Sequence, residues 1–465
     1  MSLYLKRLEV EHFRGFYTKQ TLVFAIPNGK KGSGLTVVVG PNNTGKTTIL
    51  EAVKKFAHRG NAVFTEGERH GNKNVKLSLV NTANGRKVLT TYGGSQTKFT
   101  GEEHYPDHQS FYLISARKDW QHYFGGGGSS RNAYKQQLYG MDRLGSDGSF
   151  GQRIADIERD EQKNRQFKDI IAKLLPNITH WVVDTNDNNQ RYIKYKTGTG
   201  DTHHSGFWGD GVVSLFKVAA ALVPEDESEA TNEILVIDEP ELSLHPQLQK
   251  RLANFLSQIA TDRQVVLVTH SPHFINWRDI KNGAIVLRLN KPQDRRCVIS
   301  KLDKTADHYE KLIVLAADNW QKPQLMDVVA KEIFFGEKIL FTEGQEDVGL
   351  IKKFIDENEL DIDFEIFGYG AGGAENMKYF FEIAKDLNLA KVACLLDRGK
   401  ESLEKELKRK FPSFQVDILP TRNICDKKKT IKGIFNKKGV IKRRYKKSML
   451  KLIEKWNQYF SDETS

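Results

Sequence analysis

Cysteine and long apolar runs are both scarce in this chain of 465 residues. Its three cysteines are odd in number and far apart, so they predict neither a disulfide framework nor a metal site and indicate a reducing compartment. The longest apolar stretches, such as residues 265–268, have the length of a strand, whereas a membrane-spanning helix needs roughly 20 apolar residues. The first residues also lack the apolar core of a signal peptide. We therefore expect a cytoplasmic protein with no membrane partner.

The composition is that of a globular protein whose charge is unevenly distributed. The chain is too long for one hydrophobic core, and we expect two or three domains. The formal net charge is +12, and residues 427–447 contain nine lysines and two arginines without an acidic residue. Such a segment attracts polyanions, so it predicts contact with nucleic acid. The alternative is a solvated tail that only keeps the protein soluble.

Short apolar strands alternate with helices in two series along the chain. The second series runs from Lys338 to about Leu419, and the weakly patterned stretch 303–331 joins it to the first. Alternating strands and helices predict parallel sheets, and hence an α/β fold, in both series. The elements expected in the first series are strands at 34–40, 234–237 and 265–268, helices at 47–58, 154–175 and 246–259, and a hairpin turn at 187–189.

A phosphate-binding loop follows the strand at 34–40. Its sequence fits the pattern G-x-x-x-x-G-K-[ST] between a strand and a helix, which is the context that the pattern requires. In such a loop, backbone N–H groups stabilise phosphate charge, Lys46 reaches the β- and γ-phosphates, and Thr47 binds Mg²⁺. ATP and Mg²⁺ are therefore the expected cofactors of this site. The residues expected to contact ATP are Gly40, Pro41, Asn42, Asn43, Thr44, Gly45, Lys46, Thr47 and Thr48.

A second strand end supplies two carboxylates to the expected ATP site. Residues 234–237 lead into Asp238 and Glu239. We expect Asp238 to bind Mg²⁺ through water and Glu239 to act catalytically by polarising the attacking water. About 190 residues separate Lys46 from Asp238, far more than the core of a small GTPase allows.

These motifs resemble those of ABC/SMC-like ATPase heads, including the RecF-like and OLD (overcoming lysogenization defect) groups. In that resemblance residues 244–246 correspond to the D-loop, and His270 to the switch histidine that senses the γ-phosphate. Residues 8–16 are similar to the first strand of such heads.

The resemblance also implies that a signature loop from a second subunit completes each ATP site. The best candidate is residues 209–211, in which Gly211 would contact ATP and Gly209 stands where the family has serine. Loss of that hydroxyl implies weak activation of hydrolysis across the dimer. Fewer than 100 residues separate Ser115 from this loop, which is too short for a long coiled-coil arm.

Acidic residues also mark two strand ends in the second series. Glu343 and Asp397 each follow an apolar strand, and Asp347 lies one helical turn beyond Glu343. Carboxylates at the carboxyl ends of neighbouring parallel strands can share a divalent cation, and oxygen ligands suit Mg²⁺ or Mn²⁺. Such metals assist phosphodiester cleavage by activating water. Glu343, Asp347 and Asp397 are therefore candidate metal ligands, and Glu343 and Asp397 are candidate catalytic residues.

This second arrangement resembles a Toprim domain. Glu343 and Gly344 match the end of its first strand, residues 370–373 match its glycine-containing turn, and Asp397 matches the first acid of its Asp-x-Asp motif. Gly399 stands where the second aspartate is expected. The alternative is an α/β domain whose acidic strand ends are solvated. Three residues remain open as substitutes for the missing acid: Glu401, Glu346 and Asp426.

A head followed by a Toprim-like domain is the arrangement of OLD-family nucleases. The resemblance implies an ATP-binding, divalent-metal-dependent DNA endonuclease of bacterial anti-phage defence, acting as a homodimer or larger homo-oligomer. DNA would bind the basic segment and the Toprim cleft, and a lysine beyond the Toprim core would assist catalysis. Some relatives lie beside retrons, so a reverse transcriptase and its non-coding RNA are possible partners. The expected boundaries are 1–325 for the head, 335–425 for the Toprim-like domain, and 426–465 for a basic segment packed on or beside it.

Two other functions fit the same motifs. The glycine at position 399 is compatible with an ATP-driven DNA clamp for repair that carries an inactive Toprim fold. A regulatory subunit whose ATP state controls a separate toxin or nuclease is the second alternative. Metal-dependent cleavage of nucleic acid would separate the endonuclease from both.

Overall fold

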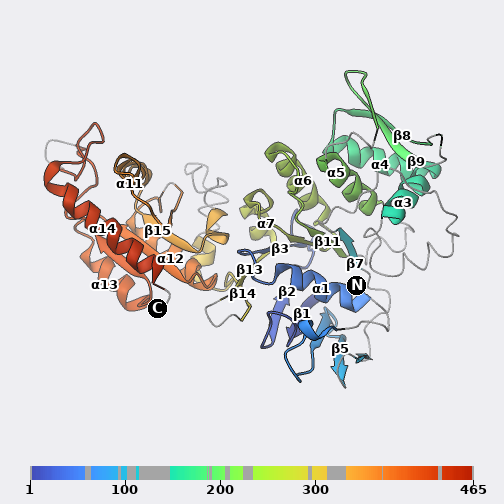
Figure 1. Cartoon of the computed structure of the whole chain (residues 1–465), viewed down its shortest axis with the longest axis horizontal. Helices are drawn as coiled ribbons and strands as arrows, with labels where there is room; N and C mark the ends of the chain where they lie inside the picture. The colour runs from blue at the N-terminus through green and yellow to red at the C-terminus, as the bar shows by residue number, and fades with distance from the viewer. Residues whose placement is uncertain are drawn as a thin grey trace. The chain divides into compact units, whose positions relative to one another are not determined.

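The described part of the chain forms two compact units, each with α/β structure (Figure 1). The first comprises residues 1–39 and 43–287, and the second comprises residues 40–42 and 288–465. Among the described residues no helix is long and apolar enough to cross a membrane. The computed structural model describes residues 3–57, 64–92, 96–101, 111–114, 147–185, 187, 191–204, 210–223, 234–291, 296–311, 331–368, 370–427 and 432–462.

A six-stranded sheet with the order β14-β13-β3-β12-β11-β7 carries the phosphate-binding loop. The pairs β3–β12, β12–β11 and β11–β7 are parallel, and all five residues of β3 are buried, as expected for a strand covered on both faces. Helix α1 (Lys46–Ala57) follows the loop, and α6 (Pro246–Ile259) connects β11 to β12. The strands are β3 (Leu35–Val39), β7 (Phe111–Ile114), β11 (Ile234–Asp238), β12 (Val265–Val268), β13 (Ile285–Asn290) and β14 (Val298–Lys301).

Two antiparallel sheets complete the first unit. One has the order β2-β1-β4-β5-β6, and the other is the hairpin β8–β9 with β10 at its edge. The predicted hairpin is therefore present, although most of its turn lies outside the described residues. The strands are β1 (Leu5–Glu11), β2 (Gln20–Val23), β4 (Lys76–Asn81), β5 (Arg86–Tyr92), β6 (Gln96–Gly101), β8 (Ile178–Thr185), β9 (Arg191–Thr197) and β10 (Thr202–His204), and further helices are α5 (Asp210–Leu222) and α7 (Trp277–Asn282).

The single exposed helix predicted over residues 154–175 is wrong. The structure has two helices, α3 (Asp147–Arg159) and α4 (Glu161–Leu174). Asp160 lies between them with an extended backbone, and its carboxylate accepts hydrogen bonds of 3.0 Å from the N–H groups of Gln162 and Lys163. This is an N-cap, which begins a new helix. The same segment is amphipathic, because Phe167 is fully buried against Trp181 and Phe216.

The second unit contains a parallel four-stranded sheet with the order β16-β15-β17-β18. Every residue of β17 is buried, so this is a central strand covered on both faces. Its strands are β15 (Lys338–Thr342), β16 (Glu365–Ile366), β17 (Lys391–Leu396) and β18 (Gln415–Ile418), and its helices are α11 (Gln345–Glu357), α12 (Met377–Asp386), α13 (Glu401–Lys410) and α14 (Arg443–Ser461). Single 3-10 turns lie at Glu66–Glu68, Pro272–Phe274, Glu332–Phe334 and Ala374–Asn376.

Helix α14 supplies part of the hydrophobic core of this second unit. Its buried residues recur at helical spacing, and the largest, Trp456, is fully buried and packs edge-on against Phe364. The indole Nε1 of Trp456 donates a 2.9 Å hydrogen bond to Asp417, which satisfies the polar end of the ring. Through α14, the basic C-terminal segment is therefore built into the fold.

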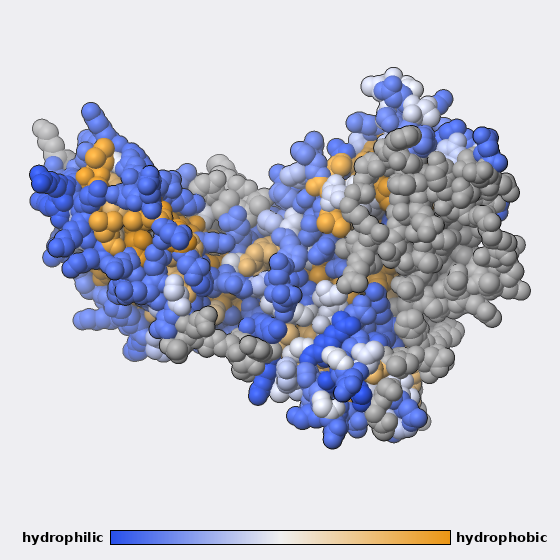
Figure 2. Space-filling view, viewed as in Figure 1, coloured by the Kyte–Doolittle hydropathy of each residue, from blue (hydrophilic) through white to orange (hydrophobic). Residues whose placement is uncertain are grey.

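On the face seen in Figure 2, hydrophilic residues predominate over both units and hydrophobic residues gather in a smaller area of the second.

Candidate functional site

The first candidate site lies where three adjacent strands end. The parallel strands β3, β12 and β11 are neighbours, with Val38 level with Val268 and Val268 level with Asp238. The phosphate-binding loop follows β3, His270 follows β12, and Asp238 ends β11. The structure thus brings the predicted loop, switch histidine and acids to one edge of one sheet.

The phosphate-binding loop has the strained backbone that its glycines permit. Gly40 and Gly45 have φ angles of 145° and 99°, which disfavour any side chain. Lys46 is buried, and burial lowers the pKa of its amine to about 8, although Glu239 and Asp238 oppose that shift. A cation held in a buried site is a strong partner for phosphate. Of the other predicted contacts, Thr44 and Thr48 are buried, Pro41 and Gly45 are half-buried, and Asn42, Asn43 and Thr47 are exposed.

The two acids that follow β11 have distinct environments. Burial and the adjacent charge of Glu239 raise the pKa of Asp238 to about 6, although Lys54 and Lys46 oppose the shift. Glu239 has a φ angle of 45°, a conformation that costs energy for a residue with a side chain. Its N–H donates a 2.7 Å hydrogen bond to the carbonyl of Val268, which holds the strained residue against the next strand.

Glu241 is a residue of this site that the sequence did not single out. Its Oε1 accepts a 2.6 Å hydrogen bond from the N–H of His270, and its Oε2 accepts a 2.7 Å bond from Thr269 Oγ1. The loop after β11 therefore holds the backbone of His270, the predicted switch histidine. Burial and the charge of Lys46 lower the pKa of His270, which favours its neutral form. The signal available was a third acid two residues beyond Glu239.

Gly211 packs against the D-loop of its own chain. A Cβ at Gly211 would lie 2.6 Å from the carbonyl oxygen of Ser243 and 3.0 Å from Leu244, so no side chain fits there. Ser243 itself has a φ angle of 61°. Gln249 links the loop that contains Leu244 to the segment after β12. Its side-chain amide donates a 2.8 Å hydrogen bond to the carbonyl of Leu244 and accepts a 2.7 Å bond from Ser271 Oγ. Gly209, which belongs to the same predicted signature loop, lies outside the described residues.

The second candidate site, which we call the acidic centre, lies at the ends of β15 and β17. These strands are parallel neighbours, with Thr342 level with Leu395. Glu343 Oε1 accepts a 2.7 Å hydrogen bond from the N–H of Asp397, so the two acids are adjacent. Asp347 lies in the first turn of α11 and accepts a 2.8 Å bond from the N–H of Gly344. The structure therefore groups all three predicted carboxylates.

The carboxylates of the acidic centre repel one another. Burial, together with the negative charge of Glu343, raises the pKa of Asp347 to about 6 and that of Asp397 to about 7. A close approach of backbone shapes the site, because a Cβ at Gly370 would lie 2.7 Å from backbone atoms of Gly344. Only glycine fits there, which explains the glycine-containing turn.

The missing second aspartate has a structural reason. Gly399 has a φ angle of 98°, a conformation that favours glycine over aspartate. Each residue left open as a substitute has another partner. Glu401 accepts from the N–H of Gly399 (3.2 Å), Glu346 pairs with Lys427 (3.5 Å), and Asp426 pairs with Lys442 (2.7 Å).

Lys427 is the residue of the basic segment that lies beside the acidic centre. Its Nζ pairs with Glu346, and its positive charge opposes the raised pKa values of Asp347 and Asp397. The sequence offered no reason to choose it, since it is one of nine lysines in residues 427–447. Lys427 can be identified only from the position that the segment takes in the folded chain.

The donors of the acidic centre fit a hard divalent cation. Carboxylate oxygens suit Mg²⁺ or Mn²⁺, and a cation would relieve the repulsion that raises the two aspartate pKa values. Across the described ranges, no three His, Cys, Asp or Glu side chains form a ready metal-binding group. Mg²⁺ often binds through one or two carboxylates and water, and Glu343 with Asp397 can supply that set.

Two family models together match residues 3–276 of the chain. Residues 3–108, which include the phosphate-binding loop, match the family described as "AAA domain". Residues 103–276, which include Asp238 and His270, match "AAA domain, putative AbiEii toxin, Type IV TA system". Both halves of the first candidate site therefore fall in regions similar to AAA domains.

Three curated proteins are similar to this chain. "Endonuclease GajA" of Bacillus cereus (strain HuB5-5) is 26% identical over 199 residues, which is 37% of this chain and 28% of GajA. "Septu protein PtuA" of Bacillus thuringiensis is 24% identical over 300 residues, 56% of this chain and 72% of PtuA. "OLD nuclease" of Thermus scotoductus (strain ATCC 700910 / SA-01) is 26% identical over 162 residues, 33% of this chain and 29% of that protein. The match thus spans less than a third of two of these relatives.

Solved structures similar to the chain include SMC heads. The SMC head domain from Thermotoga maritima has a TM-score of 0.39 and 15% identity, covering 64% of this chain and 99% of that one. An SmcHead bound to the C-winged helix domain of ScpA has a TM-score of 0.44 and 14% identity, covering 65% of this chain and 98% of that one.

Proposed function

We propose that this chain is an OLD-like, ATP-dependent and divalent-metal-dependent DNA endonuclease of anti-phage defence. The observation that carries the proposal is the grouping of Glu343, Asp347 and Asp397 at adjacent strand ends in a chain that also has a complete phosphate-binding loop. The relatives named as endonuclease GajA and OLD nuclease support the nuclease assignment, and Septu protein PtuA supports a defence role.

The first site is proposed to bind and hydrolyse ATP. Lys46 would neutralise phosphate charge, Thr47 and Asp238 would hold Mg²⁺, and Glu239 would polarise the attacking water. His270 would sense the γ-phosphate from the end of β12, the strand that lies between β3 and β11. Gly211, in a second subunit, would complete the site across a homodimer, so the ATP state would control assembly.

The acidic centre is proposed to cleave DNA. Glu343 and Asp397 would hold Mg²⁺ or Mn²⁺ with Asp347 beside them, and the bound cation would supply Lewis acidity and an activated water. Glu343 also orients Asp397 through its backbone bond. Lys427 would be the lysine that stabilises developing negative charge near the cleaved phosphate. The reverse transcriptase and non-coding RNA remain predictions without support from the relatives' names.

A cleavage assay tests this function. The purified full chain would be incubated with plasmid, single-stranded DNA and RNA in Mg²⁺ or Mn²⁺, with ATP present or absent, beside Asp397→Ala and Lys46→Ala. We expect Asp397→Ala to lose DNA cleavage by about 100-fold or more and to retain ATP hydrolysis, because it removes a metal ligand only. Lys46→Ala should lose ATP hydrolysis by about 100-fold. DNA cleavage that survives Asp397→Ala would sink the assignment of the acidic centre.

An ATP-driven DNA clamp is the second candidate function. It is favoured by Gly399, whose φ angle of 98° disfavours an aspartate at that position. For the clamp we expect ATP-dependent DNA binding by the wild type with no cleavage in either metal. Cleavage of any DNA substrate that depends on Asp397 rules it out.

A further inference from the structure

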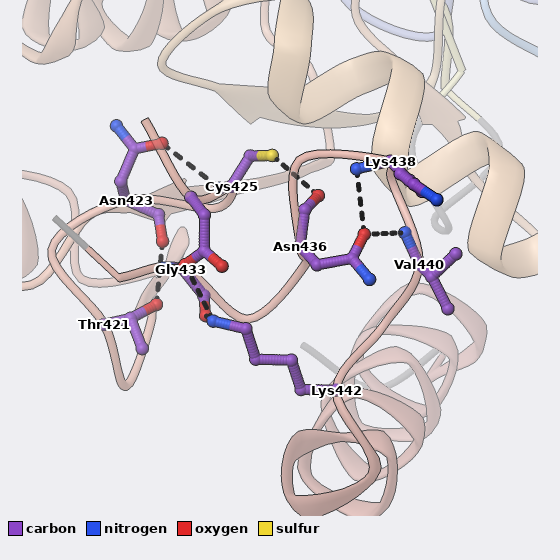
Figure 3. Close-up of polar contacts among 9 residues, drawn as sticks. Thr421, Asn423, Cys425, Gly433, Asn436, Lys438, Val440 and Lys442 are labelled. Carbon is purple, nitrogen blue, oxygen red and sulfur yellow. Dashed lines mark hydrogen bonds and ion pairs between the residues drawn. The ribbon is translucent and has the colours of Figure 1, made fainter. Parts of the chain in front are cut away.

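A lysine-rich turn lies on the same unit as the acidic centre. We call residues 436–440 the basic turn. Asn436 Oδ1 accepts hydrogen bonds from the N–H groups of Lys438 (2.9 Å) and Val440 (3.0 Å), as Figure 3 shows. Two backbone bonds, from Asn436 to Val440 and from Gly439 to Asn436, close it further. The turn therefore has one defined backbone path.

Buried contacts hold both ends of the basic turn. Cys425 Sγ donates to the carbonyl of Asn436 (3.1 Å), and Phe435, which precedes the turn, is fully buried. Asp426 accepts bonds from the Gly433 N–H (2.8 Å) and from Lys442 Nζ (2.7 Å), so it joins the segment before the turn to the one after it. This part of the basic segment is anchored, unlike a solvated tail.

The basic turn packs on the helix that carries Asp347. A Cβ at Gly439 would lie 3.1 Å from Leu350 Cδ2 and 3.4 Å from Lys353 Nζ, and both residues are in α11. Leu350 is three residues beyond Asp347, which is about 4.5 Å along a helix axis. Lys427 pairs with Glu346 in the first turn of the same helix. The basic segment thus contacts α11 both at its first turn and near Leu350.

The basic turn presents two cationic side chains and one apolar side chain to solvent. Lys437 and Lys438 are exposed, and neither forms an ion pair with a carboxylate in the part of the chain that the structure describes. Val440 is 49% exposed and is the apolar member of the surface. Other exposed cations among the described residues of 427–447 are Lys427, Lys432, Arg443, Arg444, Lys446 and Lys447.

We propose that the basic turn is a fixed contact for the phosphate backbone of duplex DNA, which it holds beside the acidic centre. The inference rests on the proposed nuclease function and names how that centre receives its substrate. Lysines that neutralise phosphates release counterions, which gives affinity without sequence preference. A backbone fixed by Asn436 presents Lys437 and Lys438 together, so less conformational entropy is lost on binding.

The first test removes the two charges. Binding of the full chain to a short fluorescent DNA duplex would be measured by anisotropy in EDTA over a range of salt concentrations. We expect Lys437→Ala/Lys438→Ala to weaken binding roughly tenfold. The slope of log K against log salt should become about 2 smaller in magnitude, because each lost phosphate contact lowers it by about 0.9. The matched control, Lys385→Ala/Lys405→Ala, removes two exposed lysines from α12 and α13 and should change neither quantity. Equal losses in both double variants would overturn the proposal.

The second test keeps every lysine and changes the turn. Asn436→Ala removes the acceptor for two backbone N–H groups, and we expect about fivefold weaker binding with an intact fold by circular dichroism. A flexible charged tail would bind unchanged, so an unchanged affinity in Asn436→Ala overturns the fixed contact. Tighter binding of an RNA duplex of the same sequence overturns the choice of DNA.

Cleavage assays separate this proposal from the nuclease function. If the wild type binds duplex DNA through the basic turn but cleaves nothing in Mg²⁺ or Mn²⁺, the nuclease function fails and the contact stands. If the wild type cleaves DNA, and the lysine double variant cleaves it with an unchanged KM, the contact fails and the nuclease function stands.

Discussion

The two sheet edges that carry the candidate sites share one local device. At the first edge, the carboxylate of Glu241, in the loop after β11, accepts a 2.6 Å hydrogen bond from the N–H of His270, which lies just after β12. In the second, Glu343 accepts the N–H of Asp397 at 2.7 Å. In both, a side chain from one strand end fixes the backbone of the next, so the reactive groups keep a defined spacing.

The two edges differ in the origin of their positive charge. Lys46 is buried among the acids of the first edge, within the loop that follows its own central strand. At the acidic centre, the described cations that act on Asp397 are Lys427, an exposed residue of the basic segment, and Lys400. One edge therefore supplies a built-in cation and backbone N–H groups for an anionic ligand. The other supplies carboxylates for a cation.

The largest effect is expected from a substitution that disrupts the acidic centre alone. Glu343→Gln removes one negative charge, and we expect it to abolish calorimetrically detected Mn²⁺ binding and reduce DNA cleavage about 100-fold or more, because neutral amides are poor partners for divalent cations. ATP hydrolysis should not change. Glu365→Gln, an exposed acid on β16, is the matched control. Mn²⁺ binding that persists in Glu343→Gln would remove this residue from the metal site.

A smaller effect is expected at the first edge. Glu241→Gln keeps one oxygen acceptor but loses the other, so the hold on His270 and Thr269 weakens. We expect kcat for ATP hydrolysis to fall about tenfold with KM nearly unchanged, since a hydrogen bond to a charged group contributes about 1.5–3 kcal/mol.

Steady-state phosphate release over a range of ATP concentrations measures this effect. Glu161→Gln, which changes a carboxylate that is 91% exposed, is the control and should behave as wild type. A loss of ATP affinity with an unchanged kcat would show that Glu241 supports binding instead of positioning the switch histidine.

The smallest effect concerns the turn after β17. Gly399→Asp places a side chain at a φ angle of 98°, and we expect it to lower the free energy of unfolding by about 1–2 kcal/mol. Gly349→Ala is a reference substitution that should change the free energy of unfolding in the opposite direction. It lies inside α11 with no atom within 4 Å of the new Cβ, and should raise stability by about 1 kcal/mol. Chemical denaturation compares the two, and equal stability of Gly399→Asp and wild type would show that the turn accepts aspartate.

Local motifs were predictable from the sequence because their residues are adjacent in the chain. The loop at 40–47, the acids after β11 and the acids after β15 and β17 all follow apolar strands, and the structure places each at a strand end. The α/β class followed from the same alternation of strands and helices.

Contacts between distant segments were not predictable in this way. Nothing in the sequence ranks Lys427 above its neighbouring lysines, because its pairing with Glu346 depends on how the basic segment returns to α11. The hold of Glu241 on His270 likewise spans 29 residues. Asp160 was missed for a different reason, since its helical periodicity continues through the position and only the cap geometry separates the two helices.

The packing of α14 has a consequence for the order of events during synthesis. The strands that carry Glu343 and Asp397 leave the ribosome before α14, yet the core beneath them includes Trp456 and its neighbours from that helix. A domain folds as a unit once its core residues are available. We therefore expect the acidic centre to form only after α14 has emerged, by which time the first unit has already been synthesised.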